Sequence, residues 1–568
     1  MATESNLCHC HCGVNLKVQK TQSRNIVLLD VGKIHLRETV KYCPTCKSSF
    51  GSEQISGRVP NYCNFGFDII EFVGRQLFVE RFTEDEVVDA LKERNVKICR
   101  REVAFLGKKF ILYLAQAHRD KEAEIKKLIH LNGGYFVHLD GTCDGASPHM
   151  FCALEELLRL VLLSRKIPTE SAEAIIPILE ELKAAYGTPL GIICDMSKAI
   201  YKAIQSVFPG IPVFLCHFHY LRDIGKDLFK NDHDLLAVTM RDFSVKTTLS
   251  KLTRDLRHLI KNYPIFSQHL EGDLEEIFTK ALPEEVLAHL LIEWIQDYTR
   301  ELHGYGFPFD RANLALAKRM TEAYEYLKTL NLKPEDRLSR IKDYLEKVLT
   351  IDFLNLVVKL EKKAWYFDRL RAIMRLAPPD GKNGLNDDGE DVDMPSMKNE
   401  FKKFIDLEEI KTAASTDIGY KKMLSQIVTY KDRLFTSGVE VVDKHGNKNH
   451  VQPERTNNCM ERLFRDEKRG IRKRTGYKSM CKVLKTMLAE TPYVKNLENT
   501  EYLKVILNGK ITLSERFAEI ESVHVRKAME KYDEEQDRLR PNVKKLIEDN
   551  NLLKKVTDAY LNRKRVAA

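Results

Sequence analysis

The stretch Gly191-Ile-Ile-Cys-Asp195 decides how the middle of this chain folds, because a short apolar run that ends on an acid predicts a buried strand with a carboxylate at its end. Gly134-Tyr-Phe-Val-His-Leu-Asp140 has the same pattern upstream, and we expect it to form the first strand of the same sheet. Ile211-Pro-Val-Phe-Leu-Cys216 predicts another strand, which runs directly into a helix beginning at His217.

The segments between these strands complete an alternating pattern. Two further strands are expected over 150–154 and 158–167, where apolar runs follow each other closely. Helices are expected over 169–182 and 197–207, because apolar residues recur there with the helical period. The resulting order is three strands, helix, strand, helix, strand, helix, which predicts an α/β fold with a mixed sheet flanked by helices. This order resembles that of ribonuclease H-like folds.

Two acids end strands of this order and are candidate catalytic residues. Asp140 ends the first strand and Asp195 the fourth, so neighbouring strand ends can bring their carboxylates together. Two carboxylates and a third acid can hold two divalent metal ions about 4 Å apart, which serve the attacking and the leaving oxygen of a phosphodiester. Asp144 competes for the first position, but Asp140 is favoured because it directly ends the strand.

Three separated motifs resemble the DDE transposases, in the branch that contains the Mutator-like and hAT elements. Asp195 is followed by Cys216 and His219, which match the Cys-x-x-His motif of that branch. Glu461, preceded by an Asn-Asn pair, matches the third acid, which in the family stands on a helix after a long helical insertion. The resemblance implies a ribonuclease H-like catalytic domain in which Asp140, Asp195 and Glu461 bind Mg²⁺ or Mn²⁺.

The resemblance covers roughly residues 60–230 and 430–490, and two assignments within it have alternatives. Asp466 and Glu467 compete with Glu461, although neither follows an Asn-Asn pair. The Cys-x-x-His pair is expected to support the catalytic site by packing and hydrogen bonding. An ordinary buried cysteine and a hydrogen-bonded core histidine are the alternative.

Two cysteine clusters near the N-terminus predict a structural zinc site. The first reads Cys8-His-Cys10-His-Cys12 and the second Cys43-Pro-Thr-Cys46. A Cys-x-x-Cys knuckle aims two thiolates at one ion, and four thiolates close the tetrahedral site of a structural zinc. We expect Cys43 and Cys46 to bind Zn²⁺ together with Cys12 and one of Cys8 or Cys10, on a zinc ribbon with two short strands. Free surface thiols are the alternative.

A helix-turn-helix is expected after the zinc ribbon. Thr83 and Glu86 form a capping-box pattern that starts one helix, and a turn near Asn95 separates it from the next. Basic residues lead the second helix, which is typical of a helix that reads DNA; they are Lys97, Arg100 and Arg101. A plain helical hairpin is the alternative.

Positive charge is concentrated beside Glu461. Between Arg455 and Lys478, nine Lys and Arg residues stand against three acids. Next to a catalytic acid such a cluster can neutralise DNA phosphates, although a solvated helix face or a nuclear import signal has the same composition. The expected DNA-binding residues of this stretch are Arg462, Arg465, Lys468, Arg469, Arg472, Lys473 and Arg474.

A long segment, 233–436, separates the second acid from the third and has the apolar pattern of helices. Residues 378–396 within it hold six acids and one lysine, which predicts a flexible acidic loop. Trp294 and Trp365 are the only tryptophans, and we expect both to pack in the core. Stacking on an extruded DNA base is the alternative.

The expected domain boundaries follow from these patterns. They are a zinc ribbon (1–60), a helix-turn-helix domain (61–130), the first part of the catalytic domain (131–232), the helical insertion (233–436), the second part of the catalytic domain with the third acid (437–495), and a helical C-terminal tail (496–568).

The composition favours an intracellular protein. The 91 Lys and Arg residues exceed the 82 Asp and Glu residues, which gives a net charge of +9 and hints at a polyanionic partner. No apolar run of about 18 residues is present, so no membrane partner is expected. The thirteen cysteines are odd in number and clustered, and the first residues lack a signal-peptide pattern, so a secreted disulfide framework is excluded. We expect DNA association, in a prokaryotic cytoplasm or a eukaryotic nucleus.

The resemblance and the N-terminal module together predict a function. We expect a DNA transposase, acting as a homodimer or higher oligomer, that binds double-stranded terminal inverted repeats, hydrolyses the DNA ends and joins them to target DNA. A domesticated regulator that binds DNA without chemistry is one alternative, and a structure-specific nuclease of the same fold is another. The presence of all three acids argues against the regulator, and the DNA-reading module argues against the nuclease.

Overall fold

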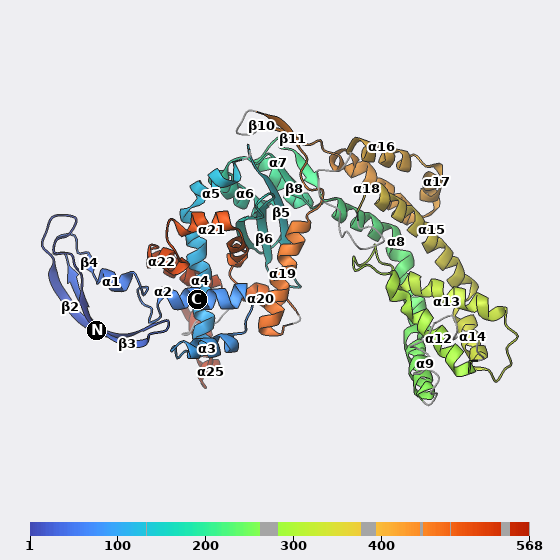
Figure 1. Cartoon of the computed structure of the whole chain (residues 1–568), viewed down its shortest axis with the longest axis horizontal. Helices are drawn as coiled ribbons and strands as arrows, with labels where there is room; N and C mark the ends of the chain where they lie inside the picture. Colours follow the sequence, from blue (N-terminus) through green and yellow to red (C-terminus); the bar gives the residue numbers. More distant parts are fainter. Residues whose placement is uncertain are drawn as a thin grey trace. The chain divides into compact units, whose positions relative to one another are not determined.

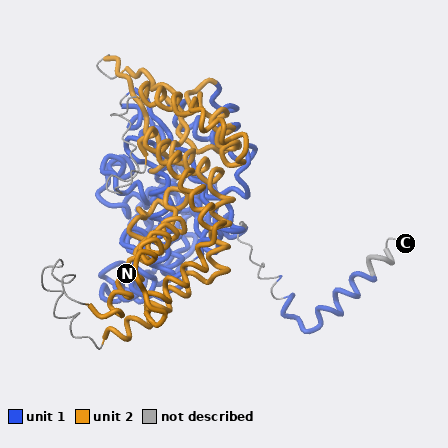
Figure 2. The backbone as a smooth tube through the Cα atoms, turned by 90° about the vertical axis from the view of Figure 1, so that its right-hand side faces the viewer, with its two compact units in different colours: residues 1–189, 202–209, 459–568 blue, residues 190–201, 210–458 orange. Residues whose placement is uncertain are grey.

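The computed structural model describes residues 1–131, 133–261, 282–376, 394–442, 447–477, 479–535, 543 and 546–566, without the side chains of 562–566. Contacts between residues divide the chain into two compact units, each assembled from separate stretches (Figure 2). Unit 1 comprises Met1–Pro189, Lys202–Pro209 and Cys459–Ala568, and unit 2 comprises Leu190–Tyr201 and Gly210–Asn458. The six domain boundaries expected from the sequence are a different, finer division and stay a prediction.

The N-terminal part of unit 1 is a long β-hairpin with two short strands and a one-turn helix attached. The two long strands are paired from Lys17↔Tyr42 to Leu28↔Gly32, and only their distal half carries a core, around Ile26, Leu28 and Leu36. The expected strands are present but longer, because the half of β2 nearer the cysteines is exposed and has no apolar pattern to mark it. The elements are β1 (Ala2–Glu4), β2 (Lys17–Leu28), β3 (Gly32–Tyr42), β4 (Ser49–Phe50) and α1 (Glu53–Ser56).

Five helical segments follow in unit 1, and the longest, α4 (Arg100–Asp120), lies at their centre (Figure 1). α2 and α4 approach closely at Gly74, where a Cβ would lie 1.9 Å from the ring of Phe110, so this position requires glycine. The second helix of the expected helix-turn-helix is therefore longer than anticipated, since most of it serves as core. The others are α2 (Phe67–Gly74), the π-helical turn η1 (Arg75–Val79), α3 (Glu84–Glu93) and α5 (Glu122–Ile129).

A five-stranded mixed sheet follows, with the strand order β7-β6-β5-β8-β9. β5, β6 and β7 are antiparallel neighbours, while β8 and β9 are parallel. The predicted succession of three strands, helix, strand, helix, strand, helix is confirmed, and the chain has the expected mixed α/β character. The elements are β5 (Phe136–Thr142), β6 (His149–Glu155), β7 (Val161–Ile167), α6 (Ala172–Tyr186), β8 (Gly191–Cys194), α7 (Lys198–Val207), β9 (Val213–Leu215) and α8 (His217–Asp242).

Unit 2 continues as a set of helices, as the sequence predicts, with one small hairpin near its end (Figure 1). The predicted acidic loop over 378–396 lies almost wholly outside the described residues, and its last residues begin α16. The elements are α9 (Val245–Ile260), α12 (Glu284–Gln296), η2 (Asp297–Glu301), α13 (Ala312–Lys328), α14 (Arg337–Val348), α15 (Ile351–Ile373), α16 (Met394–Ile405), α17 (Glu408–Thr416), α18 (Ile418–Leu434), β10 (Val439–Val442) and β11 (Lys448–Val451).

A buried ion cluster joins α8, α15 and the start of α18 within unit 2. Lys363 is 2% exposed, and its Nζ lies 2.6 Å from a carboxylate oxygen of Asp232 and 3.0 Å from one of Asp417. Burial alone would raise the pKa of Asp417, but hydrogen bonds from Lys359 and Lys363 lower it to about 2. A buried charge is tolerated only when it is paired in this way, and these ion pairs link the three helices.

Unit 1 resumes with the long helix α19, which carries the third candidate acid. The segments after it pack back onto the earlier helices of the unit; for example, the side chain of Arg516 donates to Asp120 at the end of α4. They are α19 (Asn458–Thr475), α20 (Cys481–Thr486), η3 (Thr491–Glu498), α21 (Thr500–Leu507), α22 (Leu513–Ala518), α23 (Ser522–Glu535) and α25 (Leu552–Val566).

The two tryptophans do not pack in the core, so that expectation is wrong. Trp294 is 40% exposed and Trp365 is 57% exposed. Arg319 and Arg369 lie over the two rings at 5.1 Å and 5.5 Å, and a guanidinium over an aromatic face stabilises such a ring at the surface.

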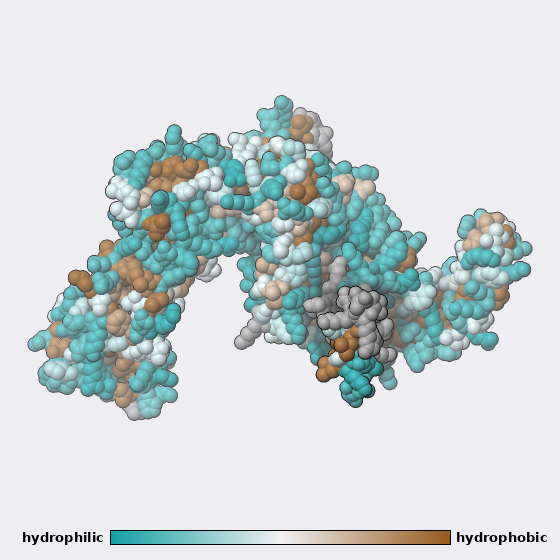
Figure 3. Space-filling model, turned by 180° about the vertical axis from the view of Figure 1, so that it is seen from behind, coloured by the Kyte–Doolittle hydropathy of each residue, from teal (hydrophilic) through white to brown (hydrophobic). Residues whose placement is uncertain are grey.

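Hydrophilic residues predominate on the face shown in Figure 3, and hydrophobic residues form separate patches on it. Scattered apolar side chains of this kind are normal on a protein surface. Among the described residues, no helix is both long enough and apolar enough to cross a membrane.

Candidate metal centres and nucleic-acid interface

Four cysteines of the N-terminal hairpin converge on one point. Sγ of Cys10 lies 3.4 Å from that of Cys46, Sγ of Cys12 lies 3.4 Å from that of Cys43, and all four sulfurs are within 4.8 Å of one another. Zinc binds thiolate sulfur at about 2.3 Å, so a tetrahedral site separates its sulfurs by about 3.8 Å. The arrangement fits Zn²⁺, and it selects Cys10 rather than the exposed Cys8.

Local backbone geometry presents these sulfurs. The second knuckle turns back on itself, with the N–H of Lys47 donating to the carbonyl of Cys43 and Lys47 in the left-handed region at φ 61°. The N–H of Cys46 lowers the pKa of the Cys43 thiol, and hydrogen bonds from Ser48 lower the pKa of Cys46 to about 6. Hydrogen bonds that favour the thiolate prepare both sulfurs for a metal. None of the thirteen cysteines, all of which are described, forms a disulfide.

The predicted helix-turn-helix has the expected local structure. Thr83 and Glu86 form the capping box, with the Thr83 N–H donating to Glu86 at 2.7 Å and the Glu86 N–H donating to Thr83 at 3.2 Å. Asn95 turns the chain in the left-handed region at φ 61°. Lys97 and Arg101 are exposed, whereas Arg100 is paired with Glu84 at 2.9 Å. DNA reading by these residues stays a prediction.

The first two candidate acids belong to neighbouring strands of the sheet. Asp140 does not end its strand as expected, because β5 continues through Gly141 to Thr142 by pairing with β6. Asp140 is 9% exposed and accepts a hydrogen bond from the N–H of Gly141 at 2.8 Å. Asp195 directly follows β8 and accepts a hydrogen bond from the N–H of Ser197 at 2.9 Å. Each carboxylate is therefore oriented by a backbone amide that follows it in the chain.

Glu461 lies in the first turn of α19, on the same helix as Lys468. The two are seven residues apart and so share a face. The charge of Lys468 contributes to lowering the pKa of Asp144, which follows β5. Lys468, on the same face of α19 as Glu461, therefore contributes to the electrostatic environment of the loop after β5.

Binding of Mg²⁺ or Mn²⁺ by the three acids stays a prediction, based on their oxygen chemistry. Asp195 belongs to unit 2, whereas Asp140 and Glu461 belong to unit 1. In the described residues, groups of three or more possible metal ligands occur at the four cysteines and around His138 and Cys459.

Asp144, the alternative to Asp140 as the first catalytic acid, has a structural role. Its carboxylate accepts hydrogen bonds from the hydroxyl of Ser479 at 3.0 Å and from the N–H groups of Met480 and Cys481 at 2.7 and 3.1 Å. These bonds lower its pKa, the Ser479 hydroxyl most of all. Asp144 anchors the start of α20, which favours Asp140 as the metal ligand.

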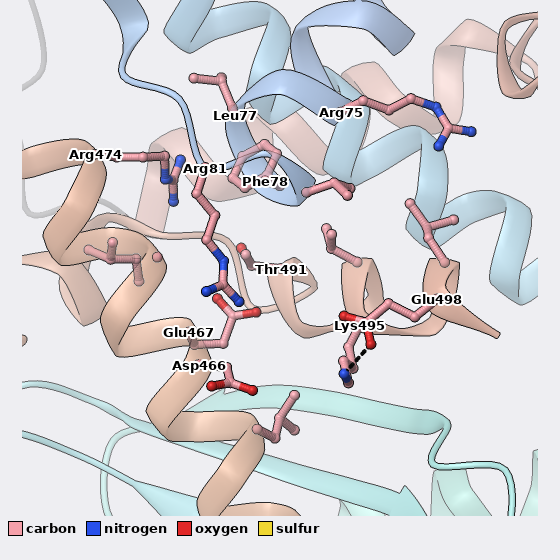
Figure 4. A pocket seen from close by; sticks show the side chains of 16 residues that line it. Arg75, Leu77, Phe78, Arg81, Asp466, Glu467, Arg474, Thr491, Lys495 and Glu498 are labelled. Carbon is pink, nitrogen blue, oxygen red and sulfur yellow. Dashed lines mark hydrogen bonds and ion pairs between the residues drawn. The ribbon is translucent and has the colours of Figure 1, made fainter.

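Asp466 and Glu467, the alternatives to Glu461 as the third acid, line a pocket of about 210 Å³ within unit 1 (Figure 4). Asp466 and Glu467 enter it from α19, and Arg81 points toward Glu467 from the segment after η1. Burial raises the pKa of Glu467, while Arg474 and Arg81 oppose that shift. Glu467 therefore has cationic neighbours from the protein, as a structural acid would.

A histidine and a cysteine near Asp140 were missed from the sequence. His138 is fully buried in β5, two residues before Asp140, and its Nε2 lies 3.6 Å from a carboxylate oxygen of Glu156. Burial alone would lower its pKa, but Cys459 and Glu156 raise the pKa of His138 well above its ordinary value. The period of a strand puts His138 and Asp140 on one face, which was the available clue.

The Cys-x-x-His pair is in direct contact within unit 2. Nδ1 of His219 lies 3.2 Å from Sγ of Cys216, and the N–H of Asn457 donates to the same sulfur at 3.1 Å. Burial lowers the pKa of His219 to about 3, so the imidazole is neutral. The pair ties the start of α8 to the Asn-Asn segment; its support of catalysis stays a prediction.

The basic residues of α19 fall into two sets. Arg474 is half-buried, with its guanidinium 4.7 Å from the Phe78 ring centroid, and burial lowers its pKa. Lys468 is partly buried. The remaining residues are exposed at spacings that place them along one helix face, which we call the α19 basic stripe; they are Arg462, Arg465, Arg469, Arg472 and Lys473.

Comparisons with known proteins do not identify a family for this chain. No family model matches the chain, and no curated protein matches it. Among solved structures, the chain is similar to the Drosophila P element transposase strand transfer complex, with 9% sequence identity and a TM-score of 0.31, over 79% of this chain and 92% of that one. A similarity this weak identifies neither the fold nor the function.

Proposed function

We propose that this chain is a metal-dependent DNA transposase of the DDE type, with Asp140, Asp195 and Glu461 as its catalytic acids. The observation that supports the proposal is the strand order: β5 and β8 are neighbours, β5 contains Asp140, and β8 is directly followed by Asp195. The order also agrees with the proposed ribonuclease H-like fold of the catalytic domain. The enzyme would hydrolyse the ends of its element and join them to target DNA.

The residues fit the divalent ions that this chemistry needs. Asp140 is a buried carboxylate of β5, and Asp195 directly follows β8. Oxygen ligands of this kind suit Mg²⁺ and Mn²⁺. When bound by Asp140, Asp195 and Glu461, such ions would activate a water or a 3′ hydroxyl at neutral pH.

The protein's own residues would bind and orient the DNA. The α19 basic stripe begins one residue after Glu461, so it would hold phosphates of the strand being cut. Lys97 and Arg101 at the start of α4 would contact the terminal inverted repeat, and the N-terminal zinc module would extend that contact. Neutralised phosphates make binding strongly dependent on salt.

The test is DNA cleavage by the full-length chain, on a plasmid that carries the gene's flanking inverted repeats. We expect Mg²⁺- or Mn²⁺-dependent end cleavage and joining, both abolished in Asp195→Ala while DNA binding is retained. Asp255→Asn, an exposed acid of α9, is the matched control and should keep full activity.

Three results would contradict the proposal. Binding without cleavage by the wild-type chain would identify a DNA-binding regulator, and cleavage without joining would identify a nuclease of the same fold. Cleavage and joining that persist in Asp195→Ala would refute the assignment of the acids.

A further inference from the structure

A groove within unit 2 surrounds Asp195. It consists of two adjoining cavities of about 510 Å³ and 300 Å³, a size suited to small ligands. The two cavities share six lining residues and are therefore continuous. We call this feature the Asp195 groove; the shared residues are Asp195, Met196, Ser197, Lys198, Thr429 and Tyr430.

Cations line the groove along its length. Arg222 lines the first cavity, Arg433 the second, and Lys198 both. The acids are Asp195 and Asp223, and the carboxylate of Asp223 lies 3.8 Å from Nζ of Lys226. In the part of the chain that the structure describes, Lys198 and Arg433 have no ion-pair partner. The groove therefore suits an anion.

Arg433 also forms an aromatic stack. Its guanidinium lies 4.5 Å from the ring centroid of Tyr201 and 4.8 Å from that of Tyr430. Two rings hold the guanidinium in place while its N–H groups remain able to donate to an anion. An arginine fixed in this way loses little conformational freedom when it binds a phosphate.

Uncharged polar groups complete the lining. The side chain of Gln426 donates to Asp227 at 2.7 Å, and its Oε1 is buried with no hydrogen-bond partner among the described residues. Thr429 and Ser425 supply hydroxyls beside it. The hydroxyls can hydrogen-bond to a nucleobase, whereas Oε1 of Gln426 is not accessible to a ligand.

We infer that the Asp195 groove binds an unpaired stretch of the DNA strand next to the bond that is cut, an inference that rests on the proposed function. Its phosphates would lie on Lys198, Arg222 and Arg433, and a base would stack near Tyr201. In a duplex the base faces and pairing edges are occupied, whereas an unpaired strand offers both. The groove thus makes Arg433 and Lys198 positioning residues for the strand at Asp195.

The experiment measures binding of a fluorescein-labelled, mixed-sequence 12-nucleotide single strand to the zinc-loaded chain without added Mg²⁺ or Mn²⁺, so that no cleavage occurs. Arg433→Gln and Lys198→Gln should each weaken binding about 3- to 10-fold. Each should also reduce the dependence of log K on log salt by about 0.7, the value for one phosphate of a single strand. Lys431→Gln removes the same charge from an exposed position of α18 outside the groove and should change neither. Tyr201→Leu should weaken binding without changing the salt dependence.

Several outcomes would overturn the inference. Equal losses in Lys431→Gln and Arg433→Gln would mean that only total charge matters, and no loss in either groove variant would exclude the site. An equal loss for the duplex would exclude the preference for an unpaired strand. Displacement of the oligonucleotide by micromolar mononucleotide would make the groove a nucleotide site.

These outcomes are separable from failure of the proposed function. If the wild-type chain shows no metal-dependent cleavage, the catalytic proposal fails, while single-strand binding without Mg²⁺ or Mn²⁺ still tests the groove. If cleavage occurs and the groove variants bind single strands normally, only the groove assignment fails.

Discussion

The cysteine site and the three acids differ in how the chain assembles them. The four sulfurs come from two short knuckles at one end of a hairpin and already lie within 4.8 Å of one another. The acids come from β5, the residue after β8, and α19, which are far apart in the sequence and belong to both units. Local structure is therefore enough to assemble the cysteine site, whereas the proposed acid site needs distant segments of the chain.

The largest effect is expected at the cysteine site. Cys43→Ser removes a ligand held by the backbone of its own knuckle, and we expect zinc bound to the purified chain to fall from about one equivalent to none. Metal analysis and hydrogen exchange of residues 1–60 measure the change, since a structural zinc and the fold around it are lost together. Full retention of zinc in this variant would contradict the assignment of Cys43 as a zinc ligand.

A large effect on activity is expected at Glu461. Glu461→Gln should lower metal-dependent cleavage about a thousand-fold, because a metal ion contributes several kcal/mol of transition-state stabilisation. Glu467→Gln, on the same helix, should keep most of the activity, since Glu467 has Arg81 and Arg474 as cationic neighbours. The reverse ranking in a cleavage assay would assign the third acid to Glu467.

A smaller effect is expected at Asp144, the structural counterpart of Asp140. Asp144→Ala should lower the thermal stability of unit 1 and leave most cleavage intact, because three hydrogen bonds to the start of α20 are lost.

The lowered pKa of Asp144 predicts how the stability difference between Asp144→Ala and the wild type changes with pH. A carboxylate whose pKa is lowered in the folded state stabilises the fold at pH values above its ordinary pKa of about 3.9. This contribution is lost as the pH falls through the lowered pKa. The melting temperatures of variant and wild type should therefore converge below about pH 4. Loss of cleavage comparable to that of Asp140→Asn would contradict the structural role.

The smallest effect is expected at Cys8. Cys8→Ser should retain the zinc and the fold, because the exposed Cys8 lies outside the converged group, whereas Cys10→Ser should lose the metal. Equal zinc contents in the two variants would show that Cys8 can replace Cys10.

The sheet could be predicted because its strands are buried apolar runs with acids or turns at their ends. The segment from Phe136 to Asp242 therefore has the expected succession of elements. The half of β2 nearer the cysteines is exposed and has no such pattern, and the length of the hairpin depends on backbone pairing that composition does not record. The sequence also predicts the two cysteine knuckles but leaves Cys8 and Cys10 as alternatives, because composition does not record which sulfur the backbone turns toward the site.

Contacts between distant segments could not be predicted. The stack of Arg433 between Tyr201 and Tyr430 joins two helices that are far apart in the sequence. His138 and Cys459 meet across a similar separation. The tryptophans were misassigned because apolarity predicts burial, whereas a neighbouring arginine can cover an exposed ring.

The central claim is that Asp140, Asp195 and Glu461 bind one metal centre, and metal-directed cleavage of the chain tests it most directly. Bound Fe²⁺, with ascorbate and peroxide, generates hydroxyl radicals that cut the backbone close to the ion. We predict cuts near residues 140, 195 and 461, suppressed by excess Mg²⁺ and absent in Asp195→Ala. Cuts confined to one of these segments, or a pattern unchanged in Asp195→Ala, would contradict a shared site.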